Sequence, residues 1–272
     1  MYKIFPVLIF FLLIVFGACG GSETKTSPAI APDPAVSVKD EKMELLQRVT
    51  VGLPDEMRQS ILADKAGFIK QLSIVMDLPE KIFIQADKQH SLGADYNPED
   101  IVMLTDYPEL VLSRNNHSLC EVLIPDLLLM VEEAGKEGLT LVISSTYRSY
   151  EYQGRVFKWN VEQNGLETAE RESARPGTSQ HQLGMAIDFG TITDDYAFTP
   201  AGMWLLENGW KYGFSLSYPN GYEDLTGYRY ECWHFRYITK AGTELQRKYF
   251  GDIQHYMISF INDYREELKS IL

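Results

Sequence analysis

The chain has 272 residues, of which 45% are hydrophobic, 12% aromatic and 23% charged, a composition typical of globular proteins with a core. This composition excludes an intrinsically disordered chain and a polytopic membrane protein. The formal net charge is −13. A chain this acidic repels phosphate backbones, so we expect no nucleic-acid partner.

The first residues indicate export from the cytoplasm. Lys3 precedes a mostly apolar run over residues 4–16, which is too short to span a bilayer and is typical of a secretory signal peptide over residues 1–18. The sequence Phe16-Gly17-Ala18-Cys19 resembles the lipobox of bacterial lipoproteins, in which the cysteine is lipidated and opens the mature chain. We therefore expect a lipid on Cys19 and a protein anchored to a membrane of the cell envelope. The alternatives are a plain export signal and an uncleaved anchor.

Two segments precede the main domain. Residues 19–40 are rich in Gly, Ser, Thr, Pro and Ala, which indicates a flexible linker. Residues 41–81 show helical periodicity, with one helix ending near Pro54 and a second from Met57 to Ile74. This N-terminal helical segment is expected to pack on the main domain as a cap or spacer.

The main domain is expected over residues 82–250, followed by a C-terminal helix over residues 251–272. Hydrophobic periodicity, together with glycine and proline positions, predicts helices over residues 124–134, 148–164 and 200–208. Short runs rich in β-branched or aromatic residues predict strands over residues 140–144, 184–189 and 233–238. Helices interleaved with a few short strands outside βαβ spacing indicate an α+β fold.

Two motifs carry side chains suited to a metal. His181 and Asp188 lie seven residues apart, and Gly177 and Gly184 on either side of the histidine permit tight turns. Glu231 precedes His234 by three residues. Two histidines and one aspartate would leave one position of a tetrahedral zinc site open for water, with Glu231 available to take its proton.

Each motif by itself is also compatible with a structural role. His181 could be a loop histidine bonded to the backbone, and His234 could be a strand histidine packed between aromatic residues. Taken singly, each motif favours that plainer interpretation. Five tyrosines cluster before Glu231, and we expect packing roles for them, with one lining a substrate groove.

The motifs together resemble a known family. Ser179-x-His181-x-x-Gly184-x-Ala186-x-Asp188, followed by Glu231-x-Trp233-His234, is similar to the VanY-type D-alanyl-D-alanine carboxypeptidases. These are zinc peptidases related to the D-Ala-D-Ala dipeptidases and to hedgehog-type domains. The pieces Tyr147-Arg148-Ser149, Gln153 and Arg175-Pro176-Gly177 fall in the family order, and the resemblance spans about residues 82 to 240. It implies a small, mainly antiparallel central sheet flanked by helices.

The resemblance also implies a role for each matching residue. His181, Asp188 and His234 would bind Zn²⁺, and Glu231 would act as general base and then as general acid. Arg148 would stabilise the oxyanion, while Gln153 and Ser179 would hold the peptide and its terminal carboxylate. The implied reaction removes a C-terminal D-alanine from peptidoglycan stem peptides, as a D,D-carboxypeptidase or as an L,D-carboxypeptidase. The alternatives are a peptidoglycan endopeptidase and a non-catalytic peptidoglycan-binding module.

One geometric requirement follows from the strand predicted over residues 233–238. Side chains alternate along a strand, so Glu231 would point away from His234 if the strand extended back to residue 231. Glu231 reaches the metal only if the chain bends at Glu231 or Cys232, or if Glu231 lies in the preceding loop. The polar segment around Gly227 favours a loop there.

Overall fold

The computed structural model describes the backbone of residues 34–272 and the side chains of residues 40–272. The predicted signal peptide, Cys19 and the linker up to residue 33 lie outside the described residues. Within the described part of the chain, no helix has both the length and the apolar character needed to cross a membrane.

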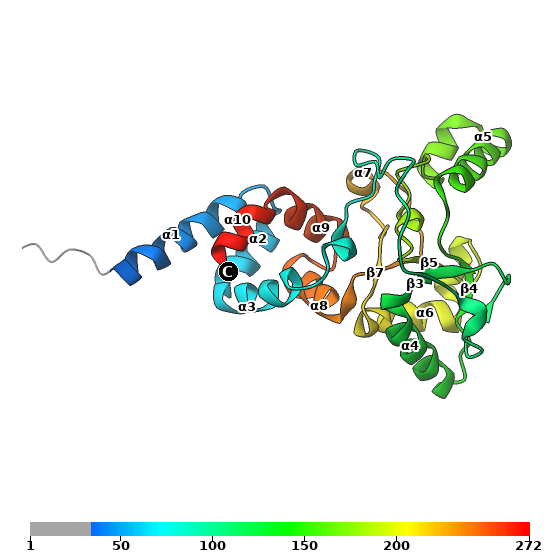
Figure 1. Cartoon of the computed structure of the whole chain (residues 1–272), viewed down its shortest axis with the longest axis horizontal. Coiled ribbons are helices and arrows are strands. Elements are labelled where there is room, and N and C mark those ends of the chain that lie inside the picture. The colour runs from blue at the N-terminus through cyan, green and yellow to red at the C-terminus, as the bar shows by residue number, and fades with distance from the viewer. Residues whose placement is uncertain (1–33) are drawn as a thin grey trace, which may run out of the picture.

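The two ends of the described chain form one helical unit, which lies beside a part containing the sheet (Figure 1). Helix α1 packs against α10, and α3 packs against α8. The ring of Phe68 lies within this unit, with its centroid 5.1 Å from that of Tyr249 and 6.2 Å from that of Phe260. The unit comprises α1 (Pro34–Val49), α2 (Asp55–Ala63), α3 (Lys65–Met76), α8 (Thr239–Tyr249), α9 (Gln254–Asp263) and α10 (Arg265–Ile271).

This helical unit differs from the sequence prediction at three places. Helix α1 begins at Pro34, inside the segment predicted as a linker. The helix predicted from Met57 to Ile74 is two helices, because the backbone leaves helical geometry at Asp64, whose carboxylate accepts a hydrogen bond from the Gly67 amide at 3.0 Å and caps α3. The predicted C-terminal helix is also two helices, which meet at Tyr264.

The main sheet has five strands in the order β2-β4-β5-β7-β6. Only the β2–β4 pair is parallel, so the expected mainly antiparallel sheet in an α+β fold is confirmed. A separate antiparallel pair joins β1 and β3, neither of which is among the predicted strands. The strands are β1 (Ile101–Met103), β2 (Val111–Leu112), β3 (Ser118–Cys120), β4 (Val142–Ser145), β5 (Ala186–Phe189), β6 (Phe214–Leu216) and β7 (His234–Tyr237).

The helices of the sheet-containing part follow the predicted positions. Helix α4 (Ile124–Lys136) has Pro125 in its first turn, and α6 (Pro200–Asn208) has the predicted bounds. Helix α5 (Tyr150–Glu172) continues beyond its predicted end, because Gly165 (φ 79°, ψ 163°) makes a kink and the helix then resumes. The shorter helices are α7 (Glu223–Thr226) and the 3₁₀ turns η1 (Glu80–Phe83), η2 (Leu104–Asp106), η3 (Glu121–Leu123), η4 (Gln180–Leu183), η5 (Asp194–Phe198) and η6 (Gly209–Tyr212).

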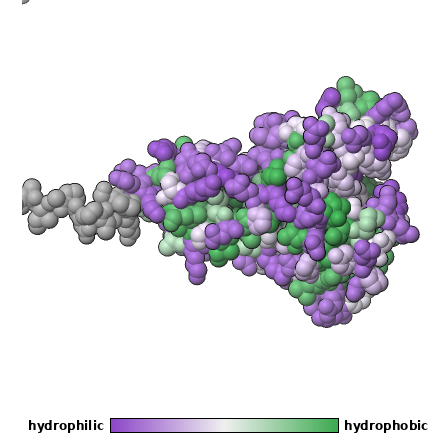
Figure 2. All heavy atoms as spheres, in the orientation of Figure 1, coloured by the Kyte–Doolittle hydropathy of each residue, from purple (hydrophilic) through white to green (hydrophobic). Residues whose placement is uncertain are grey.

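One continuous hydrophobic core joins the helical unit to the sheet and fixes the strands that carry the polar motifs. All four residues of β5 and all four of β7 are buried. Hydrophilic side chains cover much of the visible surface, with apolar groups between them (Figure 2).

Arg236 of β7 is buried, and its Nη2 donates to the carbonyl oxygens of Ile82 and Ile84 at 2.8 Å each, which ties the start of the main domain to the sheet. Cys120 and Cys232 are free, buried thiols.

Gly213, between η6 and β6, provides a test of how closely α8 is packed. It has φ +84°, and an added Cβ would lie 2.7 Å from the backbone carbon of Thr239. Gly138 has a similar φ of +76° but open space around the same position. We expect Gly138→Ala to lose about 1–2 kcal/mol of unfolding free energy from left-handed strain alone. Gly213→Ala should lose clearly more in urea denaturation, because the backbone of α8 must also shift. Equal losses for the two variants would show that the contact with Thr239 is unimportant.

Candidate metal centre and active site

The pairing of β5 with β7 places the first two candidate ligands. Asp188 and His234 lie directly opposite each other in this antiparallel pair, so their side chains project to the same face of the sheet. The Asp188 Oδ1 atom is 3.0 Å from Nδ1 of His234, and both side chains are buried. Two residues separated by 46 positions in the sequence thus meet through strand register.

His181 reaches the same point from η4. The Ser179 hydroxyl accepts a hydrogen bond from the His181 amide at 3.3 Å, which caps this turn. Gly184 ends the turn at φ +71°, where a Cβ would lie 2.7 Å from Cδ1 of Ile101, so the tight turn predicted there requires glycine. The imidazole Nε2 of His181 then lies 3.2 Å from Oδ2 of Asp188.

Hydrogen bonds on the far sides of the two imidazoles fix their protonation. Nδ1 of His181 is 2.7 Å from the carbonyl oxygen of Thr146, which can only accept, so this nitrogen carries the proton. Nε2 of His234 is 3.1 Å from the amide oxygen of Gln180, an acceptor of the same kind. In the neutral form of each ring, the other nitrogen therefore presents a lone pair to the Asp188 carboxylate. The three donor atoms lie within 4.8 Å of one another, and a cation between them would turn their repulsion into coordination.

Glu231 lies next to this group because the chain bends before β7. The His234 amide donates to the Glu231 carbonyl at 3.1 Å, which closes a turn over residues 231–234. As a result, Oε2 of Glu231 is 3.7 Å from Nδ1 of His234. The bend that the sequence required is therefore present, and strand β7 begins only at His234.

Arg148 supports Asp188 from the side of β4. Its Nη2 donates to Oδ2 of Asp188 at 2.9 Å and to the Ser145 hydroxyl at 2.8 Å, while Nη1 donates to Oε1 of Gln153 at 3.2 Å. Nε also contacts the Ser145 hydroxyl, at 3.1 Å. A register shift between Ile143 and Ser145 marks a bulge in β4 opposite Asp188. Of the five guanidinium N–H groups, the second one on Nη1 makes none of these bonds.

Gln153 lies beside Arg148. It is fully buried on α5, accepts a hydrogen bond from Arg148, and donates to the carbonyl oxygen of Ala174 at 2.8 Å. These contacts make it a support for Arg148, and its role in holding the peptide stays a prediction. Ser179 does line the cavity described below, but its hydroxyl oxygen also accepts from the His181 amide.

Burial sets the charge state of two groups. Burial, followed by the nearby Arg148 charge, lowers the pKa of His181 to about 4, so this imidazole is neutral at pH 7 and can act as a ligand. Burial and then repulsion from Asp188 raise the pKa of the Glu231 carboxyl well above its usual value. A bound cation would favour the ionised form of Glu231.

A cavity of about 450 Å³ opens onto these groups. The candidate ligands, Glu231 and Arg148 line one wall, and Trp159 of α5 and Ile192 contribute apolar surface elsewhere. The expectation that one tyrosine lines a groove is met by both Tyr218 and Tyr228, and the Tyr218 ring lies 4.8 Å from that of His234. The motifs gave no indication of Thr146, Gln180 or Ser145, because a backbone carbonyl, an amide and a hydroxyl have no characteristic ligand spacing.

A family model and several named proteins match the part of the chain that contains these residues. A family model for D-alanyl-D-alanine carboxypeptidases, VanY, matches residues 116–240. The chain is 33% identical over 177 residues to YodJ of Bacillus subtilis, named as a carboxypeptidase, with 61% of this chain and 63% of YodJ covered. It is 32% identical over 177 residues to a D-alanyl-D-alanine carboxypeptidase of Enterococcus faecium, with 63% and 54% covered. The chain thus spans less than two thirds of the length of either relative.

Solved structures agree with this assignment. The LdcB LD-carboxypeptidase is 31% identical, with a TM-score of 0.58 and with 68% of this chain and 87% of that chain covered. A vancomycin-resistance D,D-pentapeptidase, VanY, in complex with Zn(II), is 26% identical, with a TM-score of 0.55 and with 66% and 99% covered. The segment matched by the family model contains the three convergent donors, Glu231 and Arg148. The chain therefore belongs to the VanY family of D-alanyl-D-alanine carboxypeptidases.

Proposed function

We propose that this protein is a zinc-dependent carboxypeptidase that removes a C-terminal D-alanine from peptidoglycan stem peptides. The observation that carries the proposal is the convergence of two imidazole lone pairs and the Asp188 carboxylate at one wall of an open cavity, with Glu231 beside them. The substrate class rests on the relatives, which are named D-alanyl-D-alanine and LD-carboxypeptidases.

The donor set fits zinc. Two neutral imidazoles and one carboxylate are common zinc ligands in catalytic sites, and their far-side hydrogen bonds to Thr146 and Gln180 hold each ring in the required tautomer. Zinc with three protein ligands keeps a fourth position for water or substrate, strengthens that water as a nucleophile, and polarises a carbonyl. All other steps depend on the protein's own side chains.

Glu231 and Arg148 are positioned for the proton transfer and the charge stabilisation. The Glu231 carboxylate accepts a proton from the attacking water and returns it to the amine that leaves. This role is supported by the distance of 3.7 Å between Oε2 of Glu231 and Nδ1 of His234, a candidate ligand. Arg148 also lines the cavity, and the remaining N–H on its Nη1 can donate to the oxyanion that develops on the scissile carbonyl.

We also propose that the protein acts in the cell envelope, tethered through a lipid on Cys19. This proposal rests on the apolar run over residues 4–16 and on the lipobox-like sequence that ends at Cys19. Stem peptides of peptidoglycan lie outside the cytoplasmic membrane, where an exported protein would reach them.

Metal analysis tests the proposed ligands. We expect the purified protein to bind one zinc ion, and His181→Ala and His234→Ala to weaken zinc binding by more than the roughly 10–100-fold that loss of a supporting residue costs. His90→Ala is the matched control, because His90 has a half-exposed side chain in an ion pair with Asp87 at 2.8 Å. Metal content measured by mass spectrometry after dialysis decides between these outcomes. Full zinc occupancy in both ligand variants would refute the site.

Defined muropeptides test the reaction. The wild-type protein should release D-alanine from a pentapeptide ending in D-Ala-D-Ala, from a tetrapeptide with an L,D-linked D-alanine, or from both. Glu231→Gln should lower the rate by about 10²–10⁴-fold because the proton acceptor is lost. The exposed Glu109→Gln change is the control. Mass spectrometry identifies the products: an internal cut in a C-terminally blocked peptide would instead indicate an endopeptidase, and intact peptides a binding module.

The pH dependence of stability tests the buried state of Glu231. Burial and the Asp188 charge raise its pKa in the metal-free protein, so the folded state holds this proton more tightly than the unfolded chain does. The resulting stabilisation is complete below the ordinary pKa of 4.5 and is lost as the pH rises through the raised value. In the presence of a chelator, the melting temperature of Glu231→Gln minus that of the wild type should therefore increase from pH 5 to pH 8. The same difference for Glu109→Gln is the reference for this increase. A gain that shrinks with rising pH would contradict this.

A further inference from the structure

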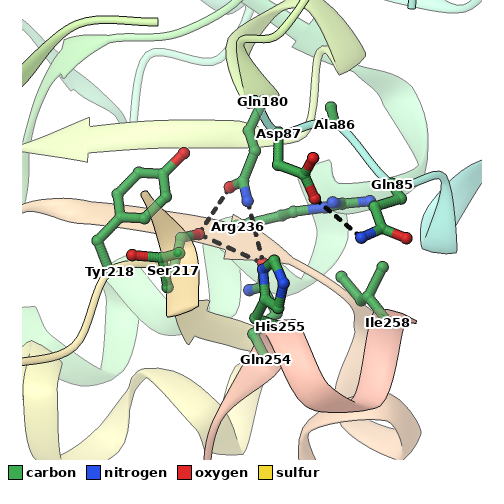
Figure 3. A pocket seen from close by; sticks show the side chains of 11 residues that line it. Gln85, Ala86, Asp87, Gln180, Ser217, Tyr218, Arg236, Gln254, His255 and Ile258 are labelled. Carbon is green, nitrogen blue, oxygen red and sulfur yellow. Dashed lines mark hydrogen bonds between the residues drawn. The ribbon is translucent and has the colours of Figure 1, made fainter. Parts of the chain in front are cut away.

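A small polar cluster lies behind the metal centre. The Gln180 side chain belongs to η4 but does not line the large cavity; it enters a separate cavity of about 20 Å³ together with Ser217 and Gln254 (Figure 3). This space is too small for a peptide. All three side chains are at least nine-tenths buried. These side chains therefore act on neighbouring groups of the protein and do not contact a peptide.

The amide oxygen of Gln180 accepts two hydrogen bonds. Nε2 of His234 lies 3.1 Å away and the Ser217 hydroxyl 2.7 Å away. An amide oxygen has two lone pairs, so both donors are accommodated. The Ser217 amide also donates to the His234 carbonyl at 3.2 Å, so Ser217 supports the histidine through the backbone and through Gln180.

The cluster extends to the C-terminal helices. The Gln180 amide nitrogen lies 3.4 Å from Oε1 of Gln254 on α9 (Figure 3). The Gln254 amide nitrogen in turn lies 3.4 Å from the Ser215 carbonyl. The orientation of the Gln180 amide is thereby set: its oxygen faces His234 and Ser217, and its nitrogen faces α9. The reverse orientation would place an N–H donor against Nε2 of His234 and leave Nδ1 protonated toward Asp188.

We propose that Gln180 is a positioning residue that keeps the proton of His234 on Nε2 and its Nδ1 lone pair directed at the metal, and that Ser217 and Gln254 hold Gln180 in this orientation. The inference rests on the proposed zinc site. Partners of this kind orient a ligating histidine and raise its basicity, and their loss costs about 10–100-fold in metal affinity.

The zinc dissociation constant, measured by competition with a chromophoric chelator, tests the role directly. Gln180→Met keeps the side-chain length but removes the acceptor, and it should weaken zinc binding by about 10–100-fold. Gln180→Glu keeps an acceptor for the Nε2 proton and should bind zinc at least as tightly as the wild type. If Gln180 donated to His234 instead, the glutamate variant would bind as poorly as the methionine variant.

Two serines of equal burial provide a matched pair. Ser217 and Ser215 are each 3% exposed, but the Ser215 hydroxyl donates to Gln246 at 2.8 Å and has no part in orienting Gln180 through its side chain. Ser217→Ala should weaken zinc binding, by less than Gln180→Met does, while Ser215→Ala should leave it unchanged. These mild substitutions keep the test valid if Gln180→Met does not fold.

The outcomes separate this inference from the proposed function. Wild-type protein that binds no zinc would overturn the metal site and this inference together. Wild-type protein that binds zinc, with Gln180→Met and Ser217→Ala binding equally well and only melting at lower temperature, would overturn the positioning role alone. The absorption spectrum of the cobalt-substituted protein gives a second readout, because a reoriented His234 should shift its visible bands in Gln180→Met but not in Ser215→Ala.

Discussion

Three lone-pair donors held face to face in a buried position are the constraint on which the rest of this site depends. His181 and His234 are each anchored by a hydrogen bond on the ring nitrogen that faces away from Asp188. Their free nitrogens then oppose a carboxylate at 3.2 and 3.0 Å. Buried acceptors that face one another are unfavourable unless a cation lies between them. With both rings neutral, the three donors therefore favour a cation between them, as expected for a candidate metal site.

The three donors and Glu231 are held by three kinds of local structure. Strand register aligns Asp188 with His234, a 3₁₀ turn closed by Gly184 presents His181, and a turn before β7 brings Glu231 alongside. Because β5 and β7 are buried along their whole length, the two strand donors cannot move apart without disrupting the core. Arg148 supplies a positive charge to Oδ2 of Asp188, the oxygen that also faces His181.

The sequence predicted the elements with clear periodicity and the residues covered by a family motif. Helices α4 and α6, the α+β class and the convergence of four motif residues followed from periodicity, spacing and family resemblance. The split at Asp64 was missed because capping by one aspartate interrupts no hydrophobic pattern. The support given by Thr146 and Gln180 could not be foreseen, since it depends on which carbonyl or amide the fold brings behind each imidazole. The contact of Gln153 with Arg148 was also not foreseen, because a motif match does not reveal burial.

The helices at the two ends of the chain have a closer relation to the site than their sequence indicated. The N-terminal helices were expected to pack on the main domain as a cap or spacer, and they share one core with the C-terminal helices and the sheet. Arg236, two residues after His234 on β7, binds the carbonyls of Ile82 and Ile84 where the chain leaves the N-terminal helices. Gln254 of α9 approaches the cluster behind His234. Since both contacts are buried, loosening the helical unit would expose polar groups directly behind a candidate ligand. The helical unit therefore contacts the strand that carries His234 and forms part of the scaffold of the candidate site.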